Sequence, residues 1–253
     1  MNTPGTTRRA ATARERARAE LTREIKEEAR RQLAATGADG LSLRAVAKEL
    51  GMVSSALYRY YPSRDDLLTA LIIDAYNALG AAAEQAVVGT ALAADAVPAR
   101  ERMIAACRAV RDWARSNPQE YALVYGSPVP GYRAPEATIG PASRVPLAFA
   151  GIVRDALAAG ELAAPREALP VSGVLAEQAV ALSEVLSRAA APESPGAPAG
   201  VPPDALVRAV IAWAQLFGMI NFELFGQFVG SFEPADALFG YAVAQLTAFV
   251  GLG

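Results

Sequence analysis

Residues 42–68 carry two short helical patterns separated by a glycine, and they constrain the fold more than any other stretch of the chain. Ser42 stands where a helix N-cap is expected. Apolar residues at helical spacing follow it, at Leu43, Val46, Ala47 and Leu50. Gly51 then suits a sharp turn, because glycine accepts the left-handed backbone that such turns often need. The pattern predicts two helices joined by a tight turn.

The second helix of this pair is predicted over about residues 54–60, with one buried face and one polar face. Leu57 and Tyr61 are expected to pack inward. A step of 100° per residue places four polar side chains on the outer arc, namely Ser54, Ser55, Tyr58 and Arg59. Pro62 ends the helix, since proline cannot continue the hydrogen-bond ladder.

A further helix is predicted to begin after Ser63, which forms a capping-box-like pair with Asp66. Its apolar residues continue to about residue 87, so it is long enough to join the N-terminal segment to the remainder of the chain. Before the pair, Leu21, Ile25, Ala29 and Leu33 recur at intervals of four and predict another helix, over about residues 16–36.

The outward face of residues 54–60 has the chemistry required to enter the major groove of DNA. Short side chains such as Ser54 and Ser55 let the backbone approach base edges, and nearby hydroxyls and cations suit phosphates. Arg59 can donate two hydrogen bonds to guanine O6 and N7. A purely structural helical hairpin is the alternative that this pattern alone leaves open.

The distribution of charge favours the DNA-binding interpretation. Residues 1–64 hold 13 Lys and Arg against 7 Asp and Glu, whereas residues 65–253 hold 11 against 19. The two net charges, +6 and −8, sum to the formal charge of −2. Such an asymmetry is expected when one end of a protein meets a polyanion.

The remaining 190 or so residues are interpreted as a helical body. Hydrophobic residues make up 53% of the chain, which permits a sizeable core. Helices are expected at about 98–116, from 118, and at about 145–159, 166–190, 204–229 and 234–250, with a loop over 126–146. We therefore predict an all-α protein with a disordered basic arm (1–15), a helix-turn-helix DNA-binding domain (16–62) and a ligand-binding and dimerisation domain (63–253) containing a flexible loop (191–203).

Enzymatic chemistry has little support in the sequence. The chain has no histidine, no phosphate-binding glycine loop and no cluster of metal-ligand residues, so we expect neither catalysis, nor a metal, nor a cofactor. The single cysteine, Cys107, lies in an apolar stretch and is expected in the core. The first 40 residues have no apolar run, which favours a cytoplasmic protein.

Residues 209–230 are apolar enough to raise the question of a membrane span. Gln215, Asn221, Glu223 and Gln227 interrupt the stretch, and no basic cluster lies close to it. We expect this helix to be buried in a protein interface, with no membrane as a partner.

Residues 42–68 resemble the DNA-binding head of the TetR-type transcriptional regulators, in the pattern S-L-R-x-V-A-x-x-L-G-M-x-x-x-A-L-Y-R-Y-Y-P-S-R-x-x-L-L. The resemblance extends over roughly residues 16–87. It implies a homodimeric regulator, most often a repressor, that binds a double-stranded DNA operator and responds to a small-molecule effector. The DNA contacts it implies are at Ser42, Arg44, Ser54, Ser55, Tyr58, Arg59, Tyr60 and Arg64.

The body is similar to the subgroup of this family that carries a Trp-x-x-x-His-Gly signature, with Phe217 here in the histidine position. We expect a pocket for a small apolar effector between helices of the body, with candidate lining residues Trp113, Tyr121, Tyr125, Phe149, Gln178 and Phe222. Small and aromatic residues at Ala214, Gly218 and Phe225 are expected in a four-helix dimer interface.

Two alternatives to an effector-responsive regulator are open at this point. One is a helical DNA-binding protein without an effector. The other is an enzyme with an accessory DNA-binding head, for which the sequence offers no catalytic constellation.

Overall fold

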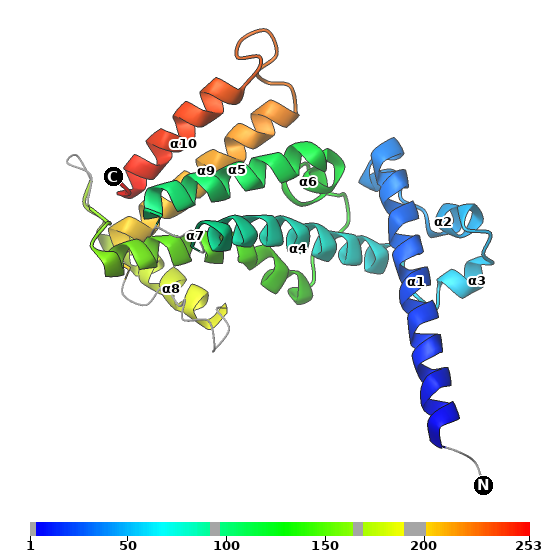
Figure 1. Ribbon diagram of the computed structural model, residues 1–253. Helices are drawn as coiled ribbons and strands as arrows, with labels where there is room; N and C mark the ends of the chain where they lie inside the picture. The colour runs from blue at the N-terminus through cyan, green and yellow to red at the C-terminus, as the bar shows by residue number, and fades with distance from the viewer. Residues whose placement is uncertain (1–3, 92–96, 164–168, 190–200) are drawn as a thin grey trace.

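The computed structural model describes residues 4–91, 97–163, 169–189 and 201–253, with the backbone alone for residues 4–12, 90–91 and 187–189. Over these residues the chain forms ten α-helices and two short 3-10 turns, and it contains no strand (Figure 1). The predicted all-α fold class is confirmed.

The N-terminal head consists of α1 (Pro4–Thr36), η1 (Ala38–Gly40), α2 (Leu43–Glu49), α3 (Ser54–Leu57) and the first turns of α4 (Arg64–Ala91). The predicted stripe on α1 forms one side of its core, since Ile25, Ala29 and Leu33 are buried against the apolar residues of α2 and α3. Leu67, Leu68, Leu71 and Ile72 of α4 complete this core. Burial of these side chains fixes the pair α2–α3 on α1 and α4.

The body is built around α4, which runs through its middle and packs against α5 (Ala99–Ser116), α6 (Pro118–Tyr125) and α7 (Ile139–Ala159) (Figure 1). A short turn, η2 (Glu136–Thr138), precedes α7. The outer layer consists of α8 (Gly173–Ala189), α9 (Pro203–Leu224) and α10 (Asp236–Val250). Residues from α4, α5, α6, α7, α9 and α10 form one continuous buried cluster.

The core of the head does not end at residue 62, where we predicted the domain boundary. Leu67 and Leu71 of α4 belong to the head's buried cluster, whereas Leu79 and Ala83 belong to the cluster of the body. Because α4 is one uninterrupted helix, it contributes apolar side chains to both cores.

Residues 4–15 are helical, and the prediction of a disordered arm there was wrong. The helix α1 begins at Pro4 rather than near residue 16. Alanine and arginine make up half of this stretch, and both have high helix propensity, which favours continuation of the helix N-terminally.

Two predicted boundaries in the middle of the chain also differ. The helix α7 begins at Ile139, within the predicted loop, and contains Pro146. Arg144 holds this turn on α4 by donating to the carboxylate of Glu84 and, over 2.8 Å, to the carbonyl oxygen of Asn77. The helix α8 begins at Gly173 instead of near residue 166.

The last two helices are shorter than predicted. The helix α9 ends at Leu224 because Gly226, just beyond its C-cap, adopts a positive φ angle of 77°, and α10 begins at Asp236. Of the predicted flexible loop, residues 191–200 lie outside the described residues, and Val201 is buried in the body.

Two helices, α4 and α9, are long and apolar enough to cross a membrane when judged by length and composition alone. A core helix of a soluble protein passes the same test, and both helices contribute buried side chains to the core of the body.

Candidate nucleic-acid interface

The turn between α2 and α3 has the geometry that the sequence predicted. Ser42 caps α2, its hydroxyl accepting a hydrogen bond of 3.4 Å from the backbone N–H of Ala45. Gly51 has a φ angle of +64°, which a side-chain-bearing residue adopts only with strain. The following helix is held from inside, because Leu57 is fully buried.

The outer side of this unit is polar and open to solvent. Ser54, Ser55, Tyr58 and Arg59 are exposed, as is Arg44 on α2, while Ser42 is half-buried. The guanidinium groups of Arg44 and Arg59 have no hydrogen-bonding or ion-pairing partner among the described residues. Guanidinium groups that have no partner within the protein and lie next to short hydroxyl side chains can bind phosphates and the edges of bases.

The last two predicted DNA contacts also interact within the protein. Arg64 donates a hydrogen bond of 2.7 Å to the carbonyl oxygen of Ala38, so it fixes η1 to the start of α4. The ring of Tyr60 lies under the guanidinium of Arg18 from α1, with 5.7 Å between the guanidinium carbon and the ring centroid. A phosphate contact by either residue is still a prediction, and for Arg64 it adds to a structural role.

Capping of α4 follows the sequence pattern. The hydroxyl of Ser63 accepts a hydrogen bond from the backbone N–H of Asp66 and donates one of 2.7 Å to its carboxylate. The start of α4 is therefore fixed next to the turn that carries α3.

An ion-pair network joins the head to the body. Arg30 of α1 contacts Asp74 of α4 at 2.8 Å and Glu120 of α6 at 3.1 Å. Lys26 adds a second contact to Asp74, also at 2.8 Å. Since these four residues come from three helices, the orientation of α1 is tied directly to the position of α6. Nothing in the sequence indicated this network, because its members lie 44 to 90 positions apart.

The residues predicted to line an effector pocket are not brought together. Tyr121 and Tyr125 stack on each other and on Phe217, within the core. Phe149 is buried in the core of the body, and Trp113 is half-buried and packs against the same core. Gln178 is exposed on α8, and Phe222 is 54% exposed at the end of α9. The sequence alone could not predict the positions of these side chains, because they depend on which face each helix turns toward the core.

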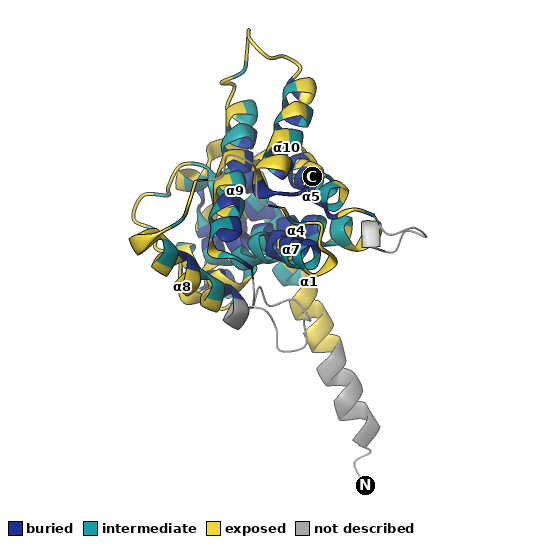
Figure 2. Ribbon diagram, turned by 90° about the vertical axis from the view of Figure 1, so that its left-hand side faces the viewer, coloured by how far each residue is buried: buried dark blue, intermediate teal, exposed yellow. Residues whose placement is uncertain are grey.

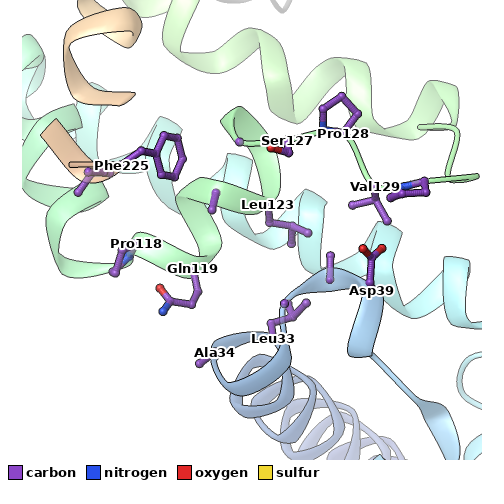
Figure 3. A pocket seen from close by; sticks show the side chains of 16 residues that line it. Leu33, Ala34, Asp39, Pro118, Gln119, Leu123, Ser127, Pro128, Val129 and Phe225 are labelled. Atoms are coloured by element: carbon purple, nitrogen blue, oxygen red, sulfur yellow. The ribbon is translucent and has the colours of Figure 1, made fainter. Parts of the chain in front are cut away.

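The structure contains two spaces that bear on ligand binding. A groove of about 600 Å³ lies between the end of α1, α6 and residues 126–130 (Figure 3). Its walls include Leu33 and Asp39 from the head and Gln119, Leu123 and Val129 from the body. The second space, about 30 Å³ in the core, is bounded by Phe149 and by Trp213, whose buried indole N–H has no acceptor among the described residues.

The predicted dimer residues lie on one apolar face that no described segment covers. Ala214 and Phe225 are exposed and Gly218 is partly exposed. Val210, Ile211 and Phe222 share this face of α9, each more than 40% exposed, and Tyr241 and Phe249 are exposed on the neighbouring α10. Figure 2 shows the two helices side by side with exposed residues along them.

Comparison with known proteins agrees with this geometry. Residues 25–71 match the family model of bacterial regulatory proteins of the tetR family, and residues 103–246 match that of the tetracyclin repressor-like C-terminal domain. The chain is 40% identical over 215 residues to HTH-type transcriptional regulator Rv1816 of Mycobacterium tuberculosis, strain H37Rv, and to Mb1846 of Mycobacterium bovis. The alignment covers 84% of this chain and 84% of each relative.

Solved structures share the whole fold. The crystal structure of SCO4313 superposes with a TM-score of 0.66 at 34% identity, over 92% of this chain and 98% of that one. A protein of unknown function from Rhodococcus sp. RHA1 has the same fold, with a TM-score of 0.62 at 24% identity over 91% and 93% of the two chains.

Proposed function

The chain belongs to the TetR family of bacterial transcriptional regulators, and on this premise we propose that it is a dimeric, effector-responsive repressor of a near-palindromic operator. A DNA-binding regulatory role follows from family membership. The dimer, the operator symmetry, the effector and the sign of regulation are proposals, as is a cytoplasmic location.

The observation that carries the proposal is the outward polar face of α3. Its serines are exposed at the N-terminal end of the helix, and Arg59 is exposed and unpaired among the described residues. We assign direct base contacts to Ser54, Ser55 and Arg59, and phosphate contacts to Ser42, Arg44, Tyr58, Tyr60 and Arg64. A DNA-binding regulator needs this polar face to be free of packing within the protein, so that the face can contact DNA.

Dimerisation is supported by the apolar face of α9 and α10. An apolar surface of this kind, exposed in a single chain, marks an interaction site. Pairing α9 and α10 with their twofold mates forms a four-helix interface through Ala214 and Gly218, where small residues allow close approach. A twofold dimer presents two α3 helices, which reach successive major grooves when they are about 34–36 Å apart or a multiple of this distance.

We assign the effector site to the groove at the junction of head and body. It is large enough for a small organic molecule, and its walls come from both parts, so occupancy depends on their relative position. An effector shifts the DNA-binding equilibrium only if it binds the two arrangements with different affinity. Leu33 lies on α1 of the head and Leu123 on α6 of the body, so a ligand held between them would satisfy this condition if release from DNA changes the position of α1 relative to α6.

The stoichiometry of the complex tests the proposal. Sedimentation equilibrium of the full chain, alone and with a labelled duplex taken from a selection on random DNA, should give a dimer and two protomers per duplex. A monomer in both conditions, or binding with no preference over random DNA, contradicts the proposed function.

A further inference from the structure

The N-terminal half of α1 extends as a helix beyond the packed head. Every residue from 13 to 20 is exposed, and from residue 13 onward Ile25 is the first buried residue of α1. Figure 1 shows this segment continuing past α3 and away from the body. Residues 4–20 add about 25 Å of helix outside the core.

Because residues 13–20 are all exposed, they add no buried side chain to the core of the head. Residues 4–20 carry five arginines and two glutamates, a net charge of +3. A polyanion is therefore the partner that this segment fits.

Two of these arginines continue the stripe that packs against the head. Leu21, Ile25, Ala29 and Leu33 form the inner stripe of α1, and Arg18 and Arg14 extend it by steps of three and four residues. The stripe thus changes from apolar to cationic where α1 leaves the core. By contrast, Arg16 and Arg23 lie on the opposite side of the helix by the same count.

The position of Arg18 relates this stripe to the recognition unit. Its guanidinium lies over the ring of Tyr60, which directly follows Arg59 at the end of the α3 segment. The two arginines of the stripe therefore lie along the edge of the surface that faces DNA in the proposed function.

We propose that residues 4–20 of α1 form a second DNA-binding surface, in which Arg14 and Arg18 bind phosphates outside the half-site read by α3. The inference rests on the proposed function, because the flanking phosphates are reached only when α3 lies in the major groove. This second surface affects the affinity for DNA and the dependence of that affinity on salt concentration, since phosphate contacts carry no sequence information.

The test compares two double variants of equal charge change, Arg14→Gln with Arg18→Gln and Arg16→Gln with Arg23→Gln. Both replace exposed side chains with a good helix former, and circular dichroism checks that the helix is retained. The binding constant of the full chain for a selected operator is measured between 50 and 200 mM KCl, on a duplex with about ten flanking base pairs at each end and on one trimmed to the half-sites.

The inference predicts that the Arg14/Arg18 variant loses about 1.8 from the slope of log K against log salt for each head, and binds at least tenfold more weakly at 150 mM. Trimming the flanks should weaken wild-type binding and leave this variant unaffected. The Arg16/Arg23 variant should resemble wild type.

Equal slopes in wild type and the Arg14/Arg18 variant, or equal losses in both variants, would overturn the inference while the proposed function stands. Dissociation of the Arg14/Arg18 dimer without DNA would also overturn it, because the segment would then lie against the acidic body of a second copy. A wild-type chain that binds no selected duplex would contradict the proposed function itself.

Discussion

Arg111 on α5 donates two hydrogen bonds, each 2.7 Å long, to the two carboxylate oxygens of Glu223 on α9. It also donates one of 3.0 Å to Asp236 at the start of α10, and its guanidinium carbon lies 4.6 Å from the centroid of the Phe239 ring. One buried side chain thus fixes the two helices of the proposed dimer interface to the core.

Replacement of Arg111 by Met should lower the free energy of unfolding by about 2–3 kcal/mol, because it leaves the carboxylate of Glu223 largely buried with weaker compensation. Arg115, at 3.6 Å from the same carboxylate, limits this decrease in stability. Thermal unfolding followed by circular dichroism measures the change in the free energy of unfolding. Arg115→Met is the matched control, and its effect should stay below about 1 kcal/mol, since Arg115 is 47% exposed. Equal melting temperatures for Arg111→Met and wild type would show that the network contributes no stability.

Gly218→Glu should convert the dimer to a monomer without unfolding the chain. A Cβ atom built at Gly218 meets no other group within 4 Å, so a side chain there causes no clash inside the protomer. A carboxylate on the apolar face of α9 would have to be buried unpaired in a twofold interface, at a cost of several kcal/mol. Sedimentation velocity provides the readout, with Gly218→Ala as the control. A variant that still sediments as a dimer would rule out this face as the interface.

Ala122→Trp should reduce operator affinity at least fivefold by filling part of the groove between α1 and α6. The indole is expected to favour the arrangement that an effector stabilises, in which the heads no longer match the operator. Fluorescence anisotropy with a labelled operator gives the affinity, and Ala122→Ser, which barely changes the groove volume, should bind as wild type does. Unchanged affinity in a stable Ala122→Trp protein would argue against the groove as the effector site.

Stability should be nearly constant between pH 6 and 8 and should fall in acid. The chain has no histidine, and burial raises the pKa of the Cys107 thiol to about 12. Hydrogen bonds from Arg208 and Arg111 lower the pKa values of Asp204 and Asp236 in the folded state. A carboxyl whose pKa is lower in the folded than in the unfolded chain stabilises the fold above its unfolded value, near 4, and this contribution is lost as the pH falls.

Asp204→Asn should therefore show a smaller drop in melting temperature between pH 5 and pH 3 than wild type does. Asp112→Asn, at an exposed position without an ion pair to any described residue, serves as the control and should keep the wild-type profile. Identical acid profiles for Asp204→Asn and wild type would refute the assigned role of the Asp204–Arg208 pair.

Local signals in the sequence were sufficient to predict the head. The cap at Ser42, the left-handed turn at Gly51 and the buried Leu57 each depend on neighbours within a few residues, and the structure shows all three. The α9 face through Ala214 and Gly218 was predictable for the same reason, since helical periodicity alone places these residues together.

The features that the sequence did not reveal depend on contacts between distant segments. The Arg30–Asp74–Glu120 network and the Arg111–Glu223 pair join residues on different helices, and a single sequence carries no signal for such pairs. The set of pocket residues could not be settled from the sequence, because helix rotation decides whether a side chain such as Gln178 points inward, and α8 turns it to solvent. The helix over residues 4–15 was missed because a basic stretch without an apolar stripe was interpreted as a solvated arm, although its alanines and arginines have high helix propensity.

The most direct test of the central claim is selection of bound fragments from random DNA, performed with wild type and with Arg59→Ala. If α3 reads the major groove as one half of a dimer, wild type should recover an inverted repeat whose half-sites are about one helical turn, or a multiple of it, apart. The Arg59→Ala selection should keep this repeat and lose its preference for one base pair in each half-site, at a cost of about 1–3 kcal/mol in discrimination. Recovery of no shared motif, or of the same motif with unchanged base preferences in Arg59→Ala, would contradict the account.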